Sequence, residues 1–287
     1  DALSNTSIGE GAGDAHTTGS QNIAVGPNAL TENTTGSANV AVGSATLDVN
    51  TTGTDNTAVG NHALGANVSG TYNVAVGAEA LEANTGGNNT AVGHRALEAN
   101  TTAGNNSALG VSALKVNTTG QYNTAVGAYA LDANTTGSGN VALGYAALSA
   151  STTHSGIIAI GENCLKTADA NSNNVAIGKD AMELTTTGSG IAIGAYALHN
   201  NTTGLRNIAI GYGALDTNTT GDDNTAVGNL AMDGNTTGSR NTAVGEQALT
   251  SNTTATNNVA VGYHALDTST TATSNTAVGA FAMEDTT

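Results

Sequence analysis

The stretch NTAVGAYALDANTTGSG, residues 123–139, contains the pattern that decides the fold of this 287-residue chain. It is preceded by NNSALGVSALKVNTTGQY and followed by NVALGYAALSA, which repeat the same order of residue types. The Gly that closes A-V-G, here termed the marker Gly, occurs 17 times. Successive marker Gly residues are 17 residues apart, except for two steps of 16 (77 to 93 and 178 to 194). A short fixed period of this kind indicates a solenoid, and both deletions are expected to shorten a loop.

Positions are numbered here from the marker Gly. Position −4 is Asn in 15 of 17 repeats, position −2 is Ala in 16, and positions −3 and −1 are almost all Thr, Val, Ile or Leu. Position +3 is Ala in 15 repeats, and position +4 is Leu in 13. The short β-branched block before the marker Gly predicts a strand, in which −3 and −1 share one face and −4 and −2 share the other.

The aliphatic positions −3 and −1 are expected to point into the coil, and Ala at −2 is expected to point outward. An outward position that is Ala in 16 of 17 repeats predicts close packing against a second copy of the chain. The candidates for interchain packing are Ala24, Ala41, Ala58, Ala75, Ala91, Ala108, Ala125, Ala142, Ala159, Ala176, Ala192, Ala209, Ala226, Ala243, Ala260 and Ala277.

The rest of the repeat predicts a corner and a turn. The marker Gly predicts a positive φ angle. The x-A-L block predicts a second short strand, whose Leu fills either the coil or the seam between chains. N-T-T-G matches a type I turn. The predicted fold is therefore an all-β parallel β-solenoid of 17 rungs, one continuous array over residues 1–287 without capping domains.

The thinness of one coil also favours self-association. Each rung is expected to bury about two large aliphatic side chains, worth roughly 3–6 kcal/mol. Ordering a rung of about 17 residues costs more than this, at about 1–2 kcal/mol per residue. Neighbours along the axis and beside it are therefore expected.

Asn at position −4 predicts a ladder of side-chain hydrogen bonds along the axis, because identical amides lie one rung apart. The ladder residues are Asn5, Asn22, Asn39, Asn56, Asn73, Asn89, Asn106, Asn123, Asn140, Asn174, Asn207, Asn224, Asn241, Asn258 and Asn275.

Position +5 is acidic in ten repeats: Asp14, Asp48, Glu82, Glu98, Asp132, Glu183, Asp216, Asp233, Asp267 and Glu284. Stacked like charges repel, so the column is expected to be a solvated edge. A row of Ca²⁺ sites is the alternative, but one acid per rung falls short of the six or more oxygens that Ca²⁺ takes. No cofactor or metal site is otherwise predicted.

Composition excludes several classes of protein. Only six Lys and Arg against 22 acids, a net charge of −16, disfavours nucleic acid as a partner. Apolar runs are too short to span a membrane, and no secretion leader opens the sequence. The single cysteine, Cys164, excludes an internal disulfide, and because it replaces an Ala it is expected to be buried and inert.

No catalytic motif is present, and the chain is not expected to be an enzyme. The six His residues (His16, His62, His94, His154, His199 and His264) fall in several columns, which favours surface substitution over a metal cluster. Aromatic side chains follow the marker Gly at Tyr129, Tyr145, Tyr196, Tyr212, Tyr263 and Phe281. They are expected either to pack at the corner or to form a lateral contact or ligand-binding stripe.

Ten N-x-[ST] sequons lie in the turn, where turn chemistry alone explains most of the pattern. As glycosylation acceptors the candidates are Asn33, Asn50, Asn67, Asn100, Asn117, Asn134, Asn201, Asn218, Asn235 and Asn252.

The core N-V-A-V-G at residues 73–77 and N-I-A-I-G at residues 207–211, each followed by x-x-A-L, resembles the head repeat of YadA-type trimeric autotransporter adhesins. It also resembles the N-T-A-V-G…A-L…N-T-T-G repeats of phage-type tail fibres and bacterial surface proteins. The resemblance covers the whole chain. It implies a left-handed parallel β-roll, three chains side by side, a location on a cell or virion surface, and an adhesive or fibre role.

The expected function is therefore a structural or adhesive extracellular fibre protein whose partner is itself. Eight residues precede the first marker Gly and eight follow the last, so end-to-end copies would keep the count of 17 and could form filaments. Ice binding, suggested by the Thr columns, and a module that binds glycans or a host receptor are the alternatives.

Overall fold

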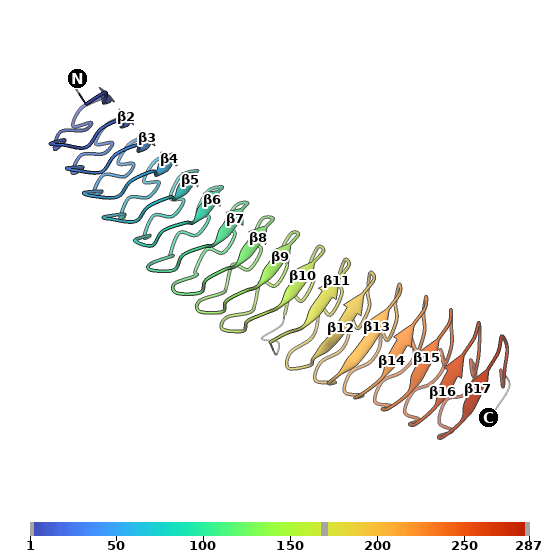
Figure 1. The fold of residues 1–287 in the computed structure, drawn as a ribbon. Coiled ribbons are helices and arrows are strands. Elements are labelled where there is room, and N and C mark those ends of the chain that lie inside the picture. Colours follow the sequence, from blue (N-terminus) through green and yellow to red (C-terminus); the bar gives the residue numbers. More distant parts are fainter. Residues whose placement is uncertain (1–2, 168–171, 285–287) are drawn as a thin grey trace. The chain divides into compact units, whose positions relative to one another are not determined.

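The computed structural model describes residues 3–167 and 172–284 (Figure 1). The chain divides into two compact units, Asp1–Ala142 and Leu143–Thr287. The fold is an all-β solenoid with 17 parallel strands about 17 residues apart and about 16 turns, and the described residues contain no helix. The predicted β-solenoid is confirmed.

Each coil contributes one strand of three or four residues. In the first unit these are β1 (Thr6–Ile8), β2 (Ile23–Val25), β3 (Val40–Val42), β4 (Thr57–Val59), β5 (Val74–Val76), β6 (Thr90–Val92), β7 (Ser107–Leu109) and β8 (Thr124–Val126). The boundary between the units falls within β9 (Val141–Leu143). The second unit contains β10 (Ile158–Ile160), β11 (Val175–Ile177), β12 (Gly190–Ile193), β13 (Asn207–Ile210), β14 (Thr225–Val227), β15 (Thr242–Val244), β16 (Val259–Val261) and β17 (Thr276–Val278).

Within each unit, consecutive strands pair in parallel, column against column. Ala24 lies opposite Ala41, for example, flanked by the pairs at −3 and −1. The two 16-residue steps keep the same register, with Ala75 opposite Ala91 and Ala176 opposite Ala192. The missing residue therefore shortens a loop and leaves the strands in place, as predicted.

The two faces of the strand are the reverse of the prediction. The side chains at −3 and −1 are exposed or half-buried in every described coil, whereas the Ala residues at −2 are at most 3% exposed within the single chain. They therefore face the interior of the coil and are not available for interchain packing. This correction applies to Ala24, Ala41, Ala58, Ala75, Ala91, Ala108, Ala125, Ala142, Ala159, Ala176, Ala192, Ala209, Ala226, Ala243, Ala260 and Ala277.

The physical reason is the narrow interior of the coil. Position −2 lies opposite position +4: a Cβ built on Gly13 (+4) would lie 2.5 Å from Oγ of Ser7 (−2). Between the first and last coils, Leu or Met occupies +4 and is fully buried, as Leu30 and Met182 are, so only a small side chain fits opposite. Each of these coils thus buries one large aliphatic side chain at +4, and the side chains at −3 and −1 that were expected inside lie outside.

The x-A-L block forms turns, so the predicted second strand is wrong. Asn28 and Leu30 have φ of 56° and 52°, and Ala29 N–H donates to Gly26 O at 3.3 Å. The N–H of Asn28 donates to the preceding coil (Glu10 O) and that of Leu30 to the following coil (Thr46 O). Burial of the Leu side chain, worth about 1.5–3 kcal/mol, offsets its left-handed backbone at about 1–2 kcal/mol. The Leu fills the coil.

The marker Gly has the predicted positive φ, between 126° and 145° throughout. A Cβ on Gly43 would lie 2.6 Å from the carbonyl oxygen of Gly60 in the next coil. Glycine is therefore required both by the backbone angle and by the close approach of the neighbouring coil.

The N-T-T-G turn is closed by its Asn side chain, since Nδ2 of Asn33 donates to Gly36 O at 2.9 Å. The N–H groups of Thr34, Thr35 and Gly36 all point at one oxygen of the next coil, Thr51 O, at 3.0–3.3 Å. The turn, like the strand, is thus bonded through its backbone to the next coil.

Candidate functional site

The Asn ladder at position −4 is confirmed. The N–H of Asn39 donates to Oδ1 of Asn22 at 3.0 Å, and the same bond recurs along both units. Nδ2 of Asn39 donates to the carbonyl oxygen of Gly53 at 2.8 Å, which ties the start of the strand to the turn that ends the same coil. Away from the ends these side chains are fully buried, so the ladder is part of the core.

A second Asn ladder, at position +7, was not predicted. Nδ2 of Asn50 donates to Oδ1 of Asn33 at 2.8 Å and to Gly53 O at 3.1 Å. The ladder stops where the next coil lacks Asn, as at Asn252, which Ser269 follows, and it is also interrupted between Asn67 and Asn84. The Oδ1 atoms of Asn67 and Asn252 are left without a partner. The recurrence of Asn in this turn column was the available signal, and it was interpreted as turn chemistry and sequons.

This second ladder overturns the glycosylation prediction. All ten sequon Asn side chains are fully buried, and their Nδ2 atoms donate hydrogen bonds inside the coil. A glycan needs Nδ2 in solvent, so the folded coil excludes it at Asn33, Asn50, Asn67, Asn100, Asn117, Asn134, Asn201, Asn218, Asn235 and Asn252.

The outer face of the strands, defined by positions −3 and −1 and termed here the strand face, carries exposed apolar side chains. Ile23 is 42% exposed, Leu109 51% and Ile158 36%. No charged residue occupies either position in any repeat, although the chain has a net charge of −16. Each unit therefore has an uncharged surface of aliphatic and Thr side chains, with one strand per coil. Surfaces of this kind commonly mark interaction sites.

The aromatic side chains near the corner are exposed, except for the half-buried Tyr196, and two pairs of them are in contact. Tyr196 and Tyr212 meet edge to face at 5.8 Å, and Tyr263 meets Phe281 at 5.2 Å. The rings come from consecutive coils. The prediction of corner packing is thus supported for these two pairs, while their exposure keeps a lateral contact open as a prediction.

The acidic column at +5 lines a groove of about 690 Å³ in the first unit. Its apolar lining comes from position +6: Val49, Ala66, Ala83, Ala99 and Val116. Gly65 stands where neighbouring coils carry a charged side chain, which opens the groove between Asp48 and Glu82.

Charged side chains at one end of the groove form a network. Nε of Arg95 lies 2.6 Å from Glu79 and 3.6 Å from Glu98, and Nζ of Lys115 lies 3.9 Å from Glu98. The hydrogen bond from Arg95 lowers the pKa of the Glu79 carboxyl. At the other end, burial raises the pKa of Asp48. The groove is therefore lined by both carboxylate acceptors and apolar side chains, a combination suited to a polyhydroxylated ligand such as a sugar.

The acidic column at +5 is only partly solvated, in contrast to the predicted solvated edge, because every acid at +5 except Asp14 is half-buried. Burial and the neighbouring charge of Asp216 raise the pKa of Asp233. A Ca²⁺ row along this column stays a prediction.

Cys164 is fully buried, and burial raises the pKa of its thiol to about 12. Sγ contacts the carbonyl oxygen of Ala176 at 3.2 Å. The prediction of a buried, unreactive cysteine agrees with this environment.

Among the described residues there is no apolar helix of membrane-spanning length. No protein-family model and no curated protein matches the chain.

Proposed function

We propose that this chain is a structural and adhesive extracellular fibre protein, and that its copies associate side by side through the strand face. The observation that carries the proposal is the exposure of aliphatic side chains at −3 and −1 on a face that holds no charge. Copies that each carry a net charge of −16 repel one another, so an uncharged apolar face is where they can approach. Three copies is the number that the resemblance to trimeric adhesin heads implies.

Regular spacing supports the same interface. One strand follows another in register, so the strand face of one copy presents the same columns at the same interval as that of its neighbour. A docked neighbour therefore repeats each favourable contact in every coil. Weak contacts repeated this way add up to a stable assembly.

The oligomeric state tests this proposal. We expect the purified chain to have the mass of three copies in analytical ultracentrifugation. Ile193→Lys together with Ile210→Glu places an ion pair on the strand face of neighbouring coils, where both Ile residues are 37% exposed. This double variant is expected to be monomeric. Thr203→Lys with Thr220→Glu makes the same change at exposed turn positions of nearby coils and is the matched control.

A chain that stays monomeric at high concentration would refute side-by-side association. Loss of the oligomer in the turn control as well would show that the effect is not specific to the strand face. Electron microscopy and antibody labelling of intact cells or virions from the source would test the fibre form and the surface location.

The adhesive part of the proposal rests on the groove over residues 48–116. Gly65→Lys would fill it with a residue that the same column carries at Lys115 and Lys166, so the coil should tolerate the change. We expect the parent chain to retain glycans on an array and Gly65→Lys to lose them. An array without any bound glycan would remove the groove as an adhesive site.

Ice binding is a second candidate, because the strand face turns the Thr column outward; Thr90 and Thr124, for example, are exposed. Val or Ile at −1 accompanies each of the seven Thr, which occupy position −3 in seven of the 17 repeats. Thermal hysteresis of the parent chain tests this use. Absence of hysteresis and of ice shaping would eliminate it without affecting the fibre proposal.

A further inference from the structure

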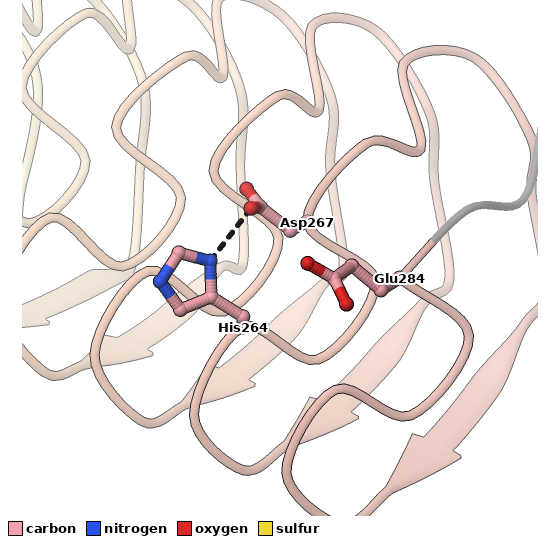
Figure 2. A group of neighbouring side chains, drawn as sticks. All are labelled: His264, Asp267 and Glu284. Carbon is pink, nitrogen blue, oxygen red and sulfur yellow. Dashed lines mark hydrogen bonds and ion pairs between the residues drawn. The ribbon is translucent and has the colours of Figure 1, made fainter.

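Three metal-ligating side chains meet near the end of the second unit (Figure 2). His264 (+2) and Asp267 (+5) come from the coil that begins with β16, and Glu284 (+5) comes from the coil of β17. One ligand atom from each lies within 4.8 Å of the others. Nδ1 of His264 lies 2.7 Å from Oδ2 of Asp267.

The carboxylates of this cluster lack a cationic side chain. Arg240 is the last Lys or Arg in the sequence, and among the ion pairs of the described residues Asp267 pairs only with His264. The side chains of His264 and Asp267 are 19% and 21% exposed, so water screens their charges only in part. Two stacked carboxylates in such a place attract a cation.

Aromatic rings hold the imidazole in position. Phe281 stacks on His264 with the planes 17° apart, and Tyr263 meets the imidazole at 4.3 Å. Nδ1 of the imidazole points toward the two acids (Figure 2). A fixed ring orientation reduces the entropy that binding must overcome.

A second His among acids, in the same unit, lacks this convergence. At His199, Nε2 faces Glu183 at 3.1 Å and Nδ1 faces Asp216 at 3.3 Å. The carboxylates lie at opposite ring nitrogens, so no single nitrogen can share an ion with both. His199 therefore bridges the acids by itself and provides a natural comparison.

We propose that His264, Asp267 and Glu284 form a binding site for a divalent transition-metal ion of the Zn²⁺ class. One imidazole nitrogen and two carboxylate oxygens are borderline ligands that suit Zn²⁺, whereas Ca²⁺ and Mg²⁺ prefer oxygen throughout. Tetrahedral bonds of about 2.0–2.2 Å place ligand atoms roughly 3.5 Å apart. Metal binding therefore replaces the 2.7 Å hydrogen bond between His264 Nδ1 and Asp267 Oδ2, with these two atoms moving apart and Glu284 moving closer. Three protein ligands leave the fourth position to water.

The ion would connect two consecutive coils. His264 and Asp267 lie in one coil and Glu284 in the next, so the metal links them by coordination bonds in addition to the backbone ladder. Binding to the folded state alone raises the unfolding temperature in proportion to the logarithm of free metal concentration. The sequence did not indicate this cluster, because its members occupy two different columns, +2 and +5, and come from two coils. The backbone at His264, in column +2, is left-handed, with φ of 51°.

Titration of the full chain, first stripped with a chelator, tests the site. We expect ZnCl₂ to bind at one ion per chain in isothermal titration calorimetry, and CoCl₂ to give the visible absorption of a tetrahedral centre. His264→Gln should weaken Zn²⁺ binding by at least about ten-fold. Glu284→Gln, a change in the other coil, should weaken it as well.

His199→Gln is the matched control and should bind Zn²⁺ as the parent chain does. Circular dichroism of each variant without metal verifies the fold. Absence of Zn²⁺ binding by the parent chain, equal binding by His264→Gln, or equal losses in the His264 and His199 variants would each overturn the proposal. So would Ca²⁺ binding that is as tight as Zn²⁺ binding and independent of His264, because it would indicate carboxylates acting alone.

Discussion

A Cβ on Gly211 would lie 2.2 Å from the carbonyl oxygen of Gly228, the marker Gly of the following coil. The backbone of Gly211 also has φ of 136°. Gly211→Ala therefore combines a backbone clash with a strained φ and is expected to cost about 3 kcal/mol or more in the free energy of unfolding. Urea denaturation followed by circular dichroism measures the loss.

Gly139→Ala is the control for Gly211→Ala. Gly139 has φ of 68°, but a Cβ there meets nothing within 4 Å. Ala38 occupies the equivalent position of another coil with φ of 58°. The cost is expected to be at most about 1–2 kcal/mol. Similar losses in both variants would contradict a special role for the contact between marker glycines.

Asn50→Ala should destabilise the fold by roughly 2–4 kcal/mol, because it removes the partners of two buried amides. Asn50 bonds to Asn33 at 2.8 Å, and Asn67 bonds to Asn50 at 3.0 Å. Thr52→Ala, at an exposed position of the same turn, should change stability by about 0.5 kcal/mol or less. Chemical denaturation of the two variants side by side gives the comparison, and equal midpoints would rule out the second ladder as a stabilising element.

Ser269→Asn should increase stability. Oδ1 of Asn252 and Oγ of Ser269 are buried without a partner, and Asn occupies this column in most coils. The new amide can donate to Asn252 Oδ1 and extend the ladder, a gain of about 1 kcal/mol. Differential scanning calorimetry is the measurement. A lower unfolding temperature would mean that this coil lacks room for the longer side chain.

Cys164 should not react with a thiol reagent in the folded chain at pH 8. Its thiol is fully buried, and burial raises its pKa to about 12, so both access and thiolate are lacking. One thiol should react once denaturant unfolds the chain. Cys164→Ala restores the usual residue of its column and should cost about 1 kcal/mol or less. Rapid labelling of the native chain would contradict the buried position.

Two Asp residues of the second unit should respond to pH in opposite directions. Burial and the charge of Asp216 raise the pKa of Asp233 above its usual 3.8. Its ionised form therefore destabilises the fold above the folded-state pKa. Asp233→Asn should raise the unfolding temperature at pH 7, and the gain should vanish as the pH falls below 3.8.

The hydrogen bonds from Arg206 lower the pKa of Asp223, with Nε at 2.6 Å and Nη2 at 2.9 Å. The ionised form of Asp223 therefore stabilises the fold above pH 3.8, and this contribution disappears as the pH falls through the lowered pKa. Asp223→Asn should lower the unfolding temperature at pH 7 and have no effect in strong acid. The same sign of change at pH 7 for both variants would contradict this assignment.

The period, the parallel register and the requirement for glycine at the marker position could be predicted from the sequence, because each follows from counting residues. The direction of the faces could not. Alternation shows that the side chains of Ala24 and Ile23 point to opposite faces of the strand, but it does not show which face points into the coil. The usual preference for aliphatic interiors places Ile23 inside, which is wrong here. The deciding quantity is the width of the coil, which Leu30 almost fills by itself.

The second half of the coil was mispredicted for a related reason. A positive φ near 52° is unfavourable for Leu, so the x-A-L block is predicted as a short strand from the sequence alone. The contacts with the neighbouring coils, which the sequence does not show, stabilise the turn instead. Burial of the sequon amides depends on the same turn. The cluster at His264 could not be found by column statistics, because each coil contributes different positions to it.

Because most coils bond their buried amides to the coil one repeat away, nearly the same interior contacts recur at each step. A gene that gains or loses one 17-residue segment by recombination therefore brings together two coils that already fit. The length of such a protein can change over generations while its architecture stays the same. Selection can therefore adjust the distance that the protein spans by one segment at a time.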